Sequence, residues 1–492
     1  MNSSLASPRP AAATTGTGAR DARDYDGRWR VFAVIVVGAF MAQLDLFIVN
    51  IAFPAIARSF PGVSASTLSW VLDAYAIVFA ACLVPAGRLG DLLGRRRVFD
   101  LGLAVFALGS AGCAAAPDVG VLIAARVVQA IGAALVLPNS LGLLLHAFPP
   151  AQRAGAVGAW ASAGAVAAAS GPPLGGVLVG IDWRLIFVVN LPLALGAIIA
   201  SRRVVPEIRH PDLGGRPDLG GMLLLIAGIG GVVLCIVEGS RWGWGSPTFV
   251  LGLAAACALI GAFLWRCAHH PAPIIELSLL RVRPFAVANA AMLIFYVGFG
   301  AMLLGSVLFL TGVWHESTIV AGLGIAPGPL CVAVISPRVK DLVGRWGPRP
   351  VAFLGGAAFA AGGAWWRWRI RPQPDYAADF LPGMILVGIG VGLMQATLYG
   401  VASGVLPANR FATGSGVLNM SRQIGLALGV AILVAILGTH ADLAAFRAGF
   451  WLFAATGLTA AFIALSLPAR RASAAAAARA PAPLPHAADP GP

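Results

Sequence analysis

Charged residues are scarce in this sequence. Only 11% of its 492 residues are Asp, Glu, Lys or Arg, whereas 59% are hydrophobic. Soluble globular domains carry about 25% charged residues, so the composition excludes a soluble protein. Apolar stretches of roughly 18 to 25 residues recur along the chain, and each is long enough to cross a hydrocarbon core of about 30 Å as a helix. Because spanning helices satisfy their own backbone hydrogen bonds, we predict an all-α integral membrane protein.

Motifs for ATP use, metal chemistry and hydrolysis are also missing. The sequence contains no Walker phosphate-binding loop, no HExxH pair and no GxSxG turn. Its six cysteines lack CxxC spacing and fall mostly within apolar stretches, which is typical of small packing residues. We therefore expect neither an enzyme nor an ATP-driven pump, and neither a metal site nor a cofactor.

Lysine is nearly absent as well. Of the 34 basic residues only Lys340 is a lysine, and the formal net charge is +14. A nucleic-acid partner would suit this charge, but the membrane explains it better, because arginines collect in loops that remain in the cytoplasm. Most of the arginines fall in the termini and the even-numbered loops, which predicts that both termini are cytoplasmic. Arg367, Arg369 and Arg371 are an exception, since their loop would face outward.

Charged and Pro/Gly-rich breaks divide the apolar stretches into fourteen predicted spans. The spans are 31–53, 68–87, 98–116, 120–147, 154–180, 184–201, 218–239, 247–267, 285–311, 318–337, 350–368, 380–403, 412–437 and 448–468. Polar, Pro-rich breaks at 202–217 and 268–284 set spans seven and eight apart. Fourteen spans then divide as six, two and six, and transporters built from such repeats bind substrate where the repeats meet.

This division predicts five segments. They are a disordered cytoplasmic N-terminus (1–28), a six-helix bundle (29–203), a linker with spans seven and eight (204–284), a second six-helix bundle (285–468) and a disordered cytoplasmic tail (469–492).

The stretch "GRLGDLLGRRR" (87–97) lies in the predicted cytoplasmic loop between spans two and three. It resembles the loop motif of the major facilitator superfamily, and the matching residues are Gly87, Asp91, Gly94, Arg95 and Arg96. The resemblance implies that Asp91 belongs to a latch that holds two bundles together in the outward-facing form. The charge pattern alone is equally compatible with a simple positive-inside anchor.

Three further stretches resemble motifs of the drug:proton antiporters in that superfamily. They are "LDLFIVNIAFP" (44–54, with Asp45, Asn50 and Pro54), "RVVQAIGAALVLP" (126–138, with Arg126, Gln129 and Gly132, but Ala130 where glycine is usual) and "SGPPLGG" (170–176, with Gly171, Pro172, Gly175 and Gly176). "DWRLIFVVNLP", "EGSRWGWGS" and "NMSRQIGLALGVAI" resemble the fourteen-helix branch. The resemblance implies a major facilitator fold of two six-helix bundles plus two inserted helices, in the cytoplasmic (inner) membrane of a bacterium.

Charges within spans are costly and mark candidate functional sites. Asp45 lies midway along the first span and Arg126 in the first half of the fourth. If the two helices are neighbours, protonation of Asp45 would free Arg126, and a cationic drug could compete for the same carboxylate. A structural pair that only fixes packing is the alternative.

Other polar side chains within spans are candidates for a substrate cavity. They are Asp73, Asn50, Gln129, Tyr296, Gln395 and Arg422. Asp73 stands where the branch usually has a small polar residue, so it is either an extra acidic group for cationic substrates or an interfacial residue facing water. Arg422 either lines the cavity or makes a packing hydrogen bond. The prolines and glycines of "SGPPLGG" predict a kink and close packing, with or without a gating role.

Together these features predict a proton-coupled antiporter that exports amphipathic drugs or antibiotics, cationic ones among them, by alternating access. Its expected partners are a small-molecule substrate, protons and the lipid bilayer, and no nucleic-acid partner is expected. We expect the protein to be a monomer. Export of an endogenous metabolite, a siderophore or a self-made antibiotic is the alternative. A membrane sensor on the same scaffold is disfavoured, because it has no need for costly intramembrane charges. A membrane enzyme is disfavoured, because the sequence lacks a set of catalytic groups.

Overall fold

The computed structural model describes residues 17–209, 218–271, 273–406, 411–438 and 442–468. The first helix group comprises α1 (Thr17–Ser59), α2 (Ala65–Leu93), α3 (Arg95–Ala115), α4 (Val119–Ala147), α5 (Pro150–Ile181), α6 (Leu185–Val188) and α7 (Asn190–Val204). A hairpin of α8 (Leu219–Trp242) and α9 (Pro247–His269) follows, and then the short α10 (Leu277–Leu280).

The second helix group begins at residue 283. It comprises α11 (Arg283–Gly312), α12 (Thr318–Ile325), α13 (Pro327–Ile335), a 3-10 turn (Ser336–Arg338), α14 (Val339–Trp346), α15 (Pro348–Arg369), a π-helical turn (Tyr376–Phe380), α16 (Leu381–Val405), α17 (Phe411–Leu437) and α18 (Leu443–Ala464). Many of these helices begin after a Ser or Asp whose side chain accepts a backbone N–H of the first turn, as at Ser64 and Asp118.

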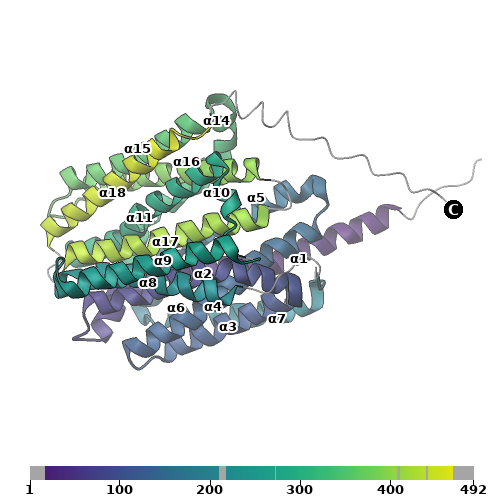
Figure 1. The fold of residues 1–492 in the computed structure, drawn as a ribbon, viewed down its shortest axis with the longest axis horizontal. Coiled ribbons are helices and arrows are strands. Elements are labelled where there is room, and N and C mark those ends of the chain that lie inside the picture. The colour runs from purple at the N-terminus through teal and green to yellow at the C-terminus, as the bar shows by residue number, and fades with distance from the viewer. Residues whose placement is uncertain (1–16, 210–217, 272, 407–410, 439–441, 469–492) are drawn as a thin grey trace, which may run out of the picture.

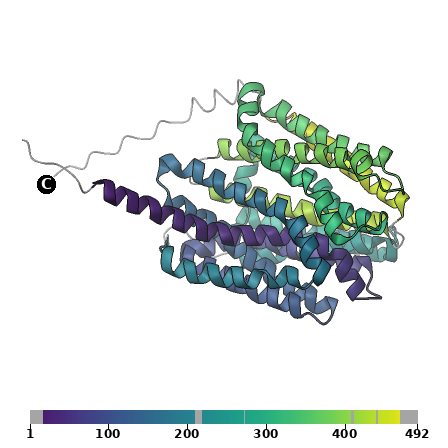
Figure 2. The same ribbon diagram turned by 180° about the vertical axis from the view of Figure 1, so that it is seen from behind.

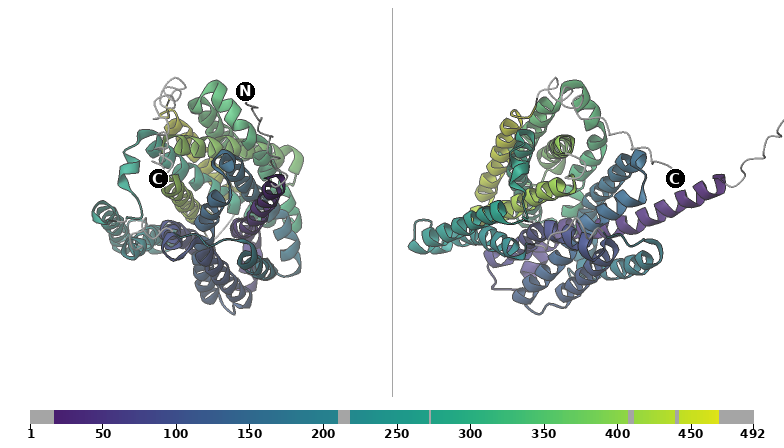
Figure 3. Two further views of the ribbon diagram at one scale, coloured as in Figure 1. Left: turned by 90° about the vertical axis from the view of Figure 1, so that its right-hand side faces the viewer. Right: turned by 45° about the vertical axis from the view of Figure 1, so that its right-hand side comes forward.

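The long helices run side by side along one direction (Figure 1). The first helix group, purple to blue, lies below the second, green to yellow. Seen from behind, α1 extends along the first group and projects beyond it at one end (Figure 2). The α8–α9 hairpin stands at the side of the molecule (Figure 3). The fold is therefore all-helical, as predicted.

The number of membrane spans differs from the predicted fourteen. Helices occupy all fourteen predicted positions, but within the described ranges only twelve segments are long and apolar enough to cross a membrane. Two of the fourteen predicted spans are not among the twelve: α15, and α5, for which the described residues give only the shorter apolar helix Val166–Ile181. Arginines at both ends of α15 and its many small residues lower its mean hydropathy. A prediction from apolar stretches between breaks does not take the mean hydropathy of each stretch into account.

The N-terminal boundary also differs from the prediction. Residues 1–28 were expected to be disordered, yet α1 already begins at Thr17. Alanine and arginine, which favour helices, are frequent just before the apolar stretch, so the helix extends past it. The predicted disordered tail, 469–492, lies outside the described residues.

The hairpin lies against both helix groups. Val233 and Val237 of α8 pack with Ile77 of α2 and Ala427 of α17 in one buried cluster. At the other end of the hairpin, Asp218 accepts hydrogen bonds from the backbone N–H of Gly221 (2.8 Å) and from Nε of Arg266 (2.6 Å). The carboxylate of Asp218 therefore caps the first turn of α8 and links α8 to α9. Much of the apolar surface of α9 stays exposed, as at Leu251 and Trp265.

Two of the three arginines that departed from the charge pattern share a partner, Asp379. Nε of Arg371 donates to Oδ2 of Asp379 (3.0 Å), and Arg369 lies 3.7 Å from the same carboxylate, which is fully buried. The hydrogen bond to Asp379 raises the pKa of the Arg371 guanidinium, so this arginine stays charged. Arg369 and Arg371 therefore balance a buried acid. Their loop carries less net positive charge than a count of its arginines alone suggests.

Backbone contact between α3 and α4 sets the position of the central polar residues. A Cβ added at Gly132 would lie 2.6 Å from the Cα of Phe106, and one added at Gly109 would lie 2.7 Å from the Cα of Gln129. Only glycine fits at such a crossing. Because the two helices touch here, Gln129 of α4 lies beside α3, where it reaches Ser110, and it also reaches Asp45 of α1.

We expect Gly132→Ala to destabilise the protein by about 1–3 kcal/mol, because the added methyl group overpacks the α3–α4 crossing. Gly196→Ala in α7 is the matched control, since a Cβ there meets no atom within 4 Å. The midpoint of thermal unfolding in detergent should fall for the first variant and stay level or rise for the second. Equal midpoints would contradict the close contact at this crossing.

Candidate functional site

A buried ion pair lies at the centre of the first helix group. Nη1 of Arg126 in α4 lies 2.5 Å from Oδ2 of Asp45 in α1, and both side chains are at most 1% exposed. The guanidinium also donates to the carbonyl of Val71 in α2 (3.0 Å) and to Oε1 of Gln129 (2.6 Å). Its carbon atom lies 4.0 Å from the ring centroid of Tyr75. The sequence-predicted pair of Asp45 and Arg126 is therefore in direct contact.

Three uncharged side chains complete the surroundings of Asp45. Nε2 of Gln129 donates to Oδ1 of Asp45 (2.9 Å) and to Oγ of Ser110 in α3 (2.7 Å). Nδ2 of Asn190 in α7 lies 3.0 Å from Oγ of Ser110 and 3.4 Å from Oδ1 of Asp45. Both carboxylate oxygens thus accept hydrogen bonds, and the network joins α1, α2, α3, α4 and α7.

Sequence reasoning did not identify Ser110 and Asn190 as members of the site. Each is a single uncharged polar residue in a long apolar stretch, and Asn190 lies within the quoted motif "DWRLIFVVNLP". A polar residue within a span is a usable signal. Which partner it takes depends on the helix arrangement, however, and the sequence does not give that.

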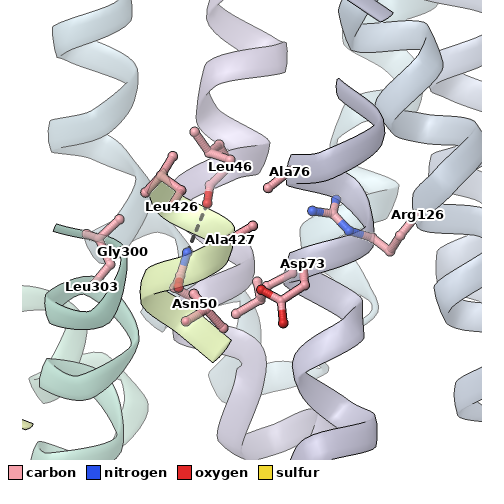
Figure 4. Close-up of a pocket in the computed structure, with 11 residues that line it drawn as sticks. Leu46, Asn50, Asp73, Ala76, Arg126, Gly300, Leu303, Leu426 and Ala427 are labelled. Carbon is pink, nitrogen blue, oxygen red and sulfur yellow. Dashed lines mark hydrogen bonds between the residues drawn. The ribbon is translucent and has the colours of Figure 1, made fainter. Parts of the chain in front are cut away.

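A small cavity of about 30 Å³ lies where the two helix groups meet (Figure 4). Its lining comes from α1, α2 and α4 on one side and from α11 and α17 on the other: Leu46, Asn50, Leu72, Asp73, Ala76, Arg126, Gly300, Leu303, Leu426, Ala427 and Val430. Asp73 is completely buried, so it does not face water at the membrane surface. Asn50 donates its amide to the carbonyl of Leu46 (3.0 Å).

The other cavity candidates do not line this space. Gln129 belongs to the Asp45 network, and Tyr296, Gln395 and Arg422 lie within the second helix group. Arg422 is 5% exposed, and its guanidinium carbon lies 5.8 Å from the ring centroid of Tyr296. The structure therefore brings together Asp45, Arg126 and Gln129, and separately Asn50, Asp73 and Arg126.

Comparison with known proteins identifies the family. Residues 35–430 match the family model of the Major Facilitator Superfamily. The chain belongs to this superfamily. It is a multi-pass membrane transporter and not an enzyme, and its relatives include exporters that confer resistance to drugs and antibiotics.

Three relatives illustrate this likeness. The multidrug resistance protein Stp of Mycobacterium tuberculosis is 36% identical over 403 residues, which cover 82% of this chain and 74% of Stp. A probable actinorhodin transporter of Streptomyces coelicolor is 32% identical, over 83% of this chain and 72% of its own. The methylenomycin A resistance protein of Bacillus subtilis is 32% identical, over 90% and 96%.

A solved structure shares the fold. The crystal structure of a D-xylose-proton symporter matches with a TM-score of 0.66 over 90% of this chain and 98% of its own, at 15% sequence identity. At this identity the likeness concerns the fold alone. The prediction of a major facilitator fold is thus confirmed, apart from the number of spans.

The loop motif of this superfamily member makes its contacts mainly within the first helix group. Asp91 pairs with Arg95 one turn later (2.6 Å), and Gly94, with a φ of 111°, joins α2 to α3. Glu207, which follows α7, accepts the backbone N–H of Arg96 (3.1 Å) and lies 3.6 Å from Arg97. Sequence reasoning missed Glu207, because it sits in a Pro-rich segment interpreted as linker.

The "SGPPLGG" segment (170–176) lies between the two helix groups. Gly171 and Gly175 of α5 face Phe47 and Ile48 of α1. The same helix also contacts α12 closely. A Cβ added at Gly176 would lie 2.8 Å from the carbonyl oxygen of Thr318 in α12. The carbonyl of Pro172 likewise packs against Gly322. Because successive helices alternate in direction, this contact lies at the end opposite the 87–97 loop.

Proposed function

We propose that the chain is a proton-coupled antiporter that exports amphipathic drugs or antibiotics, cationic ones among them, across the bacterial cytoplasmic membrane by alternating access. The observation that carries this proposal is the buried contact between Asp45 and Arg126. Charges inside a membrane protein are costly and mark proton or substrate pathways. A packing role alone would not require a carboxylate, since uncharged groups can join helices at lower cost.

Protonation of Asp45 would change the network in a defined way. The neutral acid loses its charge attraction to Arg126, which keeps its hydrogen bonds to Gln129 and the Val71 carbonyl. Weakening the contact between α1 and α4 alters the balance between two arrangements of the helices. A proton arriving from outside would therefore favour one arrangement, and its release to the cytoplasm the other.

The contact between α5 and α12 is proposed to close the outer end of the pathway. Both termini and the 87–97 loop would lie on the cytoplasmic side. In this arrangement Asp91 is bound to Arg95. We infer that Asp91 exchanges this partner for one in the second helix group when the inner end closes, which is the latch role expected for Gly87, Asp91, Gly94, Arg95 and Arg96.

The membrane topology is proposed to comprise fourteen spans. The helix α5 packs against α1 and α12, and α15 packs against α16 and α18, which supports counting both with the twelve candidate spans. The segments 29–203 and 285–468 would then be two six-helix bundles, with α8 and α9 inserted between them in a monomer. Export of an endogenous compound is the second candidate function, and the likeness to a probable actinorhodin transporter favours it.

Efflux of ethidium tests the proposal. Energised cells that produce the protein should lose preloaded ethidium faster than cells with an empty vector, and a protonophore should remove the difference. Efflux that persists with the protonophore would contradict proton coupling. If neither ethidium nor a panel of antibiotics is exported, the second candidate function gains support.

A further inference from the structure

Arg422 is a buried cation without a counter-ion among the described residues. Its side chain lies in α17 and is 5% exposed. No described carboxylate lies within ion-pair distance of its guanidinium, and its Nε atom has no hydrogen-bond partner. Arg126, the buried arginine of the first helix group, is bound to Asp45, Gln129 and the Val71 carbonyl. Charges inside a membrane protein are costly unless they are paired, so Arg422 calls for a partner.

The acids of the second helix group do not supply this partner. Asp379 is engaged by Arg369 and Arg371, and Asp442 accepts a backbone N–H at the start of α18. Asp73, which borders the cavity between the helix groups, forms no hydrogen bond with a described residue. All acids between residues 285 and 468 lie at or beside helix ends: Glu316, Asp341, Asp375, Asp379 and Asp442.

Two tyrosines lie near the guanidinium instead. Its carbon atom lies 5.8 Å from the ring centroid of Tyr296 in α11. It also interacts electrostatically with Tyr399 in α16, whose hydroxyl donates to Oδ1 of Asn419 (2.8 Å). A ring face attracts a cation but does not neutralise it. Arginine and tyrosine both donate hydrogen bonds, so these side chains suit an anionic group.

The contact between α11 and α17 fixes the level of Arg422 in the bundle. A Cβ added at Gly425 would lie 2.9 Å from Cβ of Tyr296, and one added at Gly429 would lie 2.9 Å from the backbone nitrogen of Ala301. Four residues along α17 are therefore matched by about the same advance along α11. The two helices run parallel and in close contact.

Arg422 lies one turn away from the cavity between the helix groups. Gly300 of α11 and Leu426 of α17 line this cavity (Figure 4). Tyr296 and Arg422 precede them by four residues, so they lie on the same helix faces, roughly 6 Å along each helix. Because the helices are parallel, both side chains are displaced toward the same end. A molecule in a widened cavity would therefore lie within reach of the guanidinium.

We propose that Arg422 binds the carboxylate of an amphipathic substrate, next to Tyr296. The inference rests on the proposed function and adds a class of substrate to it: amphipathic carboxylic acids. The fork of a guanidinium matches a carboxylate in a bidentate geometry. The apolar part of the substrate would contact the wall that Leu303, Leu426 and Val430 contribute to the cavity.

The site becomes accessible when the two helix groups separate. A single water molecule needs about 10–15 Å³, and the cavity measures about 30 Å³ in this arrangement. A carboxylate that binds Arg422 displaces no described ion-pair partner. At Arg126 it would have to displace Asp45, which lies 2.5 Å from the guanidinium. The two buried arginines thus differ in role: one holds an internal acid, and the other binds the acid of a substrate.

Binding of two probes to the purified full-length protein tests the assignment. Dansyl-leucine carries a carboxylate at neutral pH, whereas its methyl ester is uncharged and has the same apolar part. Each is titrated by fluorescence in detergent solution, with detergent alone subtracted. The wild type should bind the acid more tightly than the ester. Arg422→Gln should weaken binding of the acid about 30-fold, the equivalent of about 2 kcal/mol, and change the affinity for the ester little.

Two further variants separate charge from folding. Arg422→Lys keeps the charge but not the fork, and should retain part of the preference for the acid. Arg345→Gln removes an exposed arginine of α14 and should bind both probes as the wild type does. Dansyl-leucine should raise the midpoint of thermal unfolding of the wild type and of Arg345→Gln, but not that of Arg422→Gln. Without ligand, Arg422→Gln should unfold no earlier than the wild type, because the charge it removes has no described counter-ion.

Distinct outcomes overturn this inference and the proposed function. If Arg422→Gln binds dansyl-leucine as tightly as the wild type does, or if the wild type shows no preference for the acid over the ester, the role of Arg422 is refuted. Protonophore-sensitive efflux of ethidium by the wild type would still support the proposed function. Efflux that ignores a protonophore, with Arg422-dependent binding of the acid intact, refutes the proposed function instead.

Discussion

Asp45→Asn should reduce proton-driven export to the level of cells with an empty vector. Asparagine preserves the shape of the side chain but can neither take up a proton nor balance the charge of Arg126, which lies 2.5 Å away. The arrangement of α1 and α4 then no longer responds to the proton gradient. The measurement is ethidium efflux from energised cells, normalised to the amount of protein in the membrane.

Stability must be controlled in this experiment. Removing one partner of a buried ion pair costs about 3–5 kcal/mol, because the other charge is left without compensation. Asp45→Glu keeps the charge and should retain part of the activity, and thermal unfolding of both variants in detergent shows whether they are folded. A folded Asp45→Asn protein that exports ethidium at the wild-type rate and in a protonophore-sensitive manner would place the coupling group elsewhere.

Gly176→Ala should strongly impair export by opposing the contact between α5 and α12. The added methyl carbon would lie 2.8 Å from the Thr318 carbonyl oxygen and 2.9 Å from the Cα of Ile319, both parts of the backbone. Overpacking of this kind costs about 1–3 kcal/mol, which corresponds to a shift of roughly 5- to 150-fold against the closed outer end. The rate of ethidium efflux should fall accordingly.

Gly180→Ala is the matched control. It makes the same chemical change one turn later on α5, where the new methyl carbon would meet only the side chain of Ile319, at 3.4 Å. This is an ordinary van der Waals distance, so we expect export close to that of the wild type. Equal rates for the two alanine variants would show that the α5–α12 contact does not limit transport.

The sequence predicted the central pair because intramembrane charges are rare and few partners are available to them. Asp45 and Arg126 each stand in a long apolar stretch, and the cost of leaving either charge alone favours pairing. Ser110 and Asn190 could not be assigned in the same way. An uncharged polar group within a span finds partners in many arrangements, and its role emerges only when α3 and α7 are placed beside α1.

Helix number and loop contacts were harder to predict for physical reasons. The tenth predicted span is divided between α12 and α13, because Pro327 has no backbone N–H to continue the first helix. Glu207 looks like a linker residue in the sequence, yet the chain turns back after α7 and brings it to Arg96. Asp379 removes two arginines from the charge pattern through contacts that the apolar pattern does not encode.

Transport by the purified protein in liposomes tests the central claim most directly. The vesicles hold an acidic interior and a pH-sensitive dye, and ethidium is added outside. Proton-coupled exchange predicts that ethidium accumulates inside against its concentration gradient while the internal pH rises in step, and that a protonophore or Asp45→Asn abolishes both. Accumulation without a change in internal pH, or no more than in protein-free liposomes, would contradict proton-coupled export by this chain.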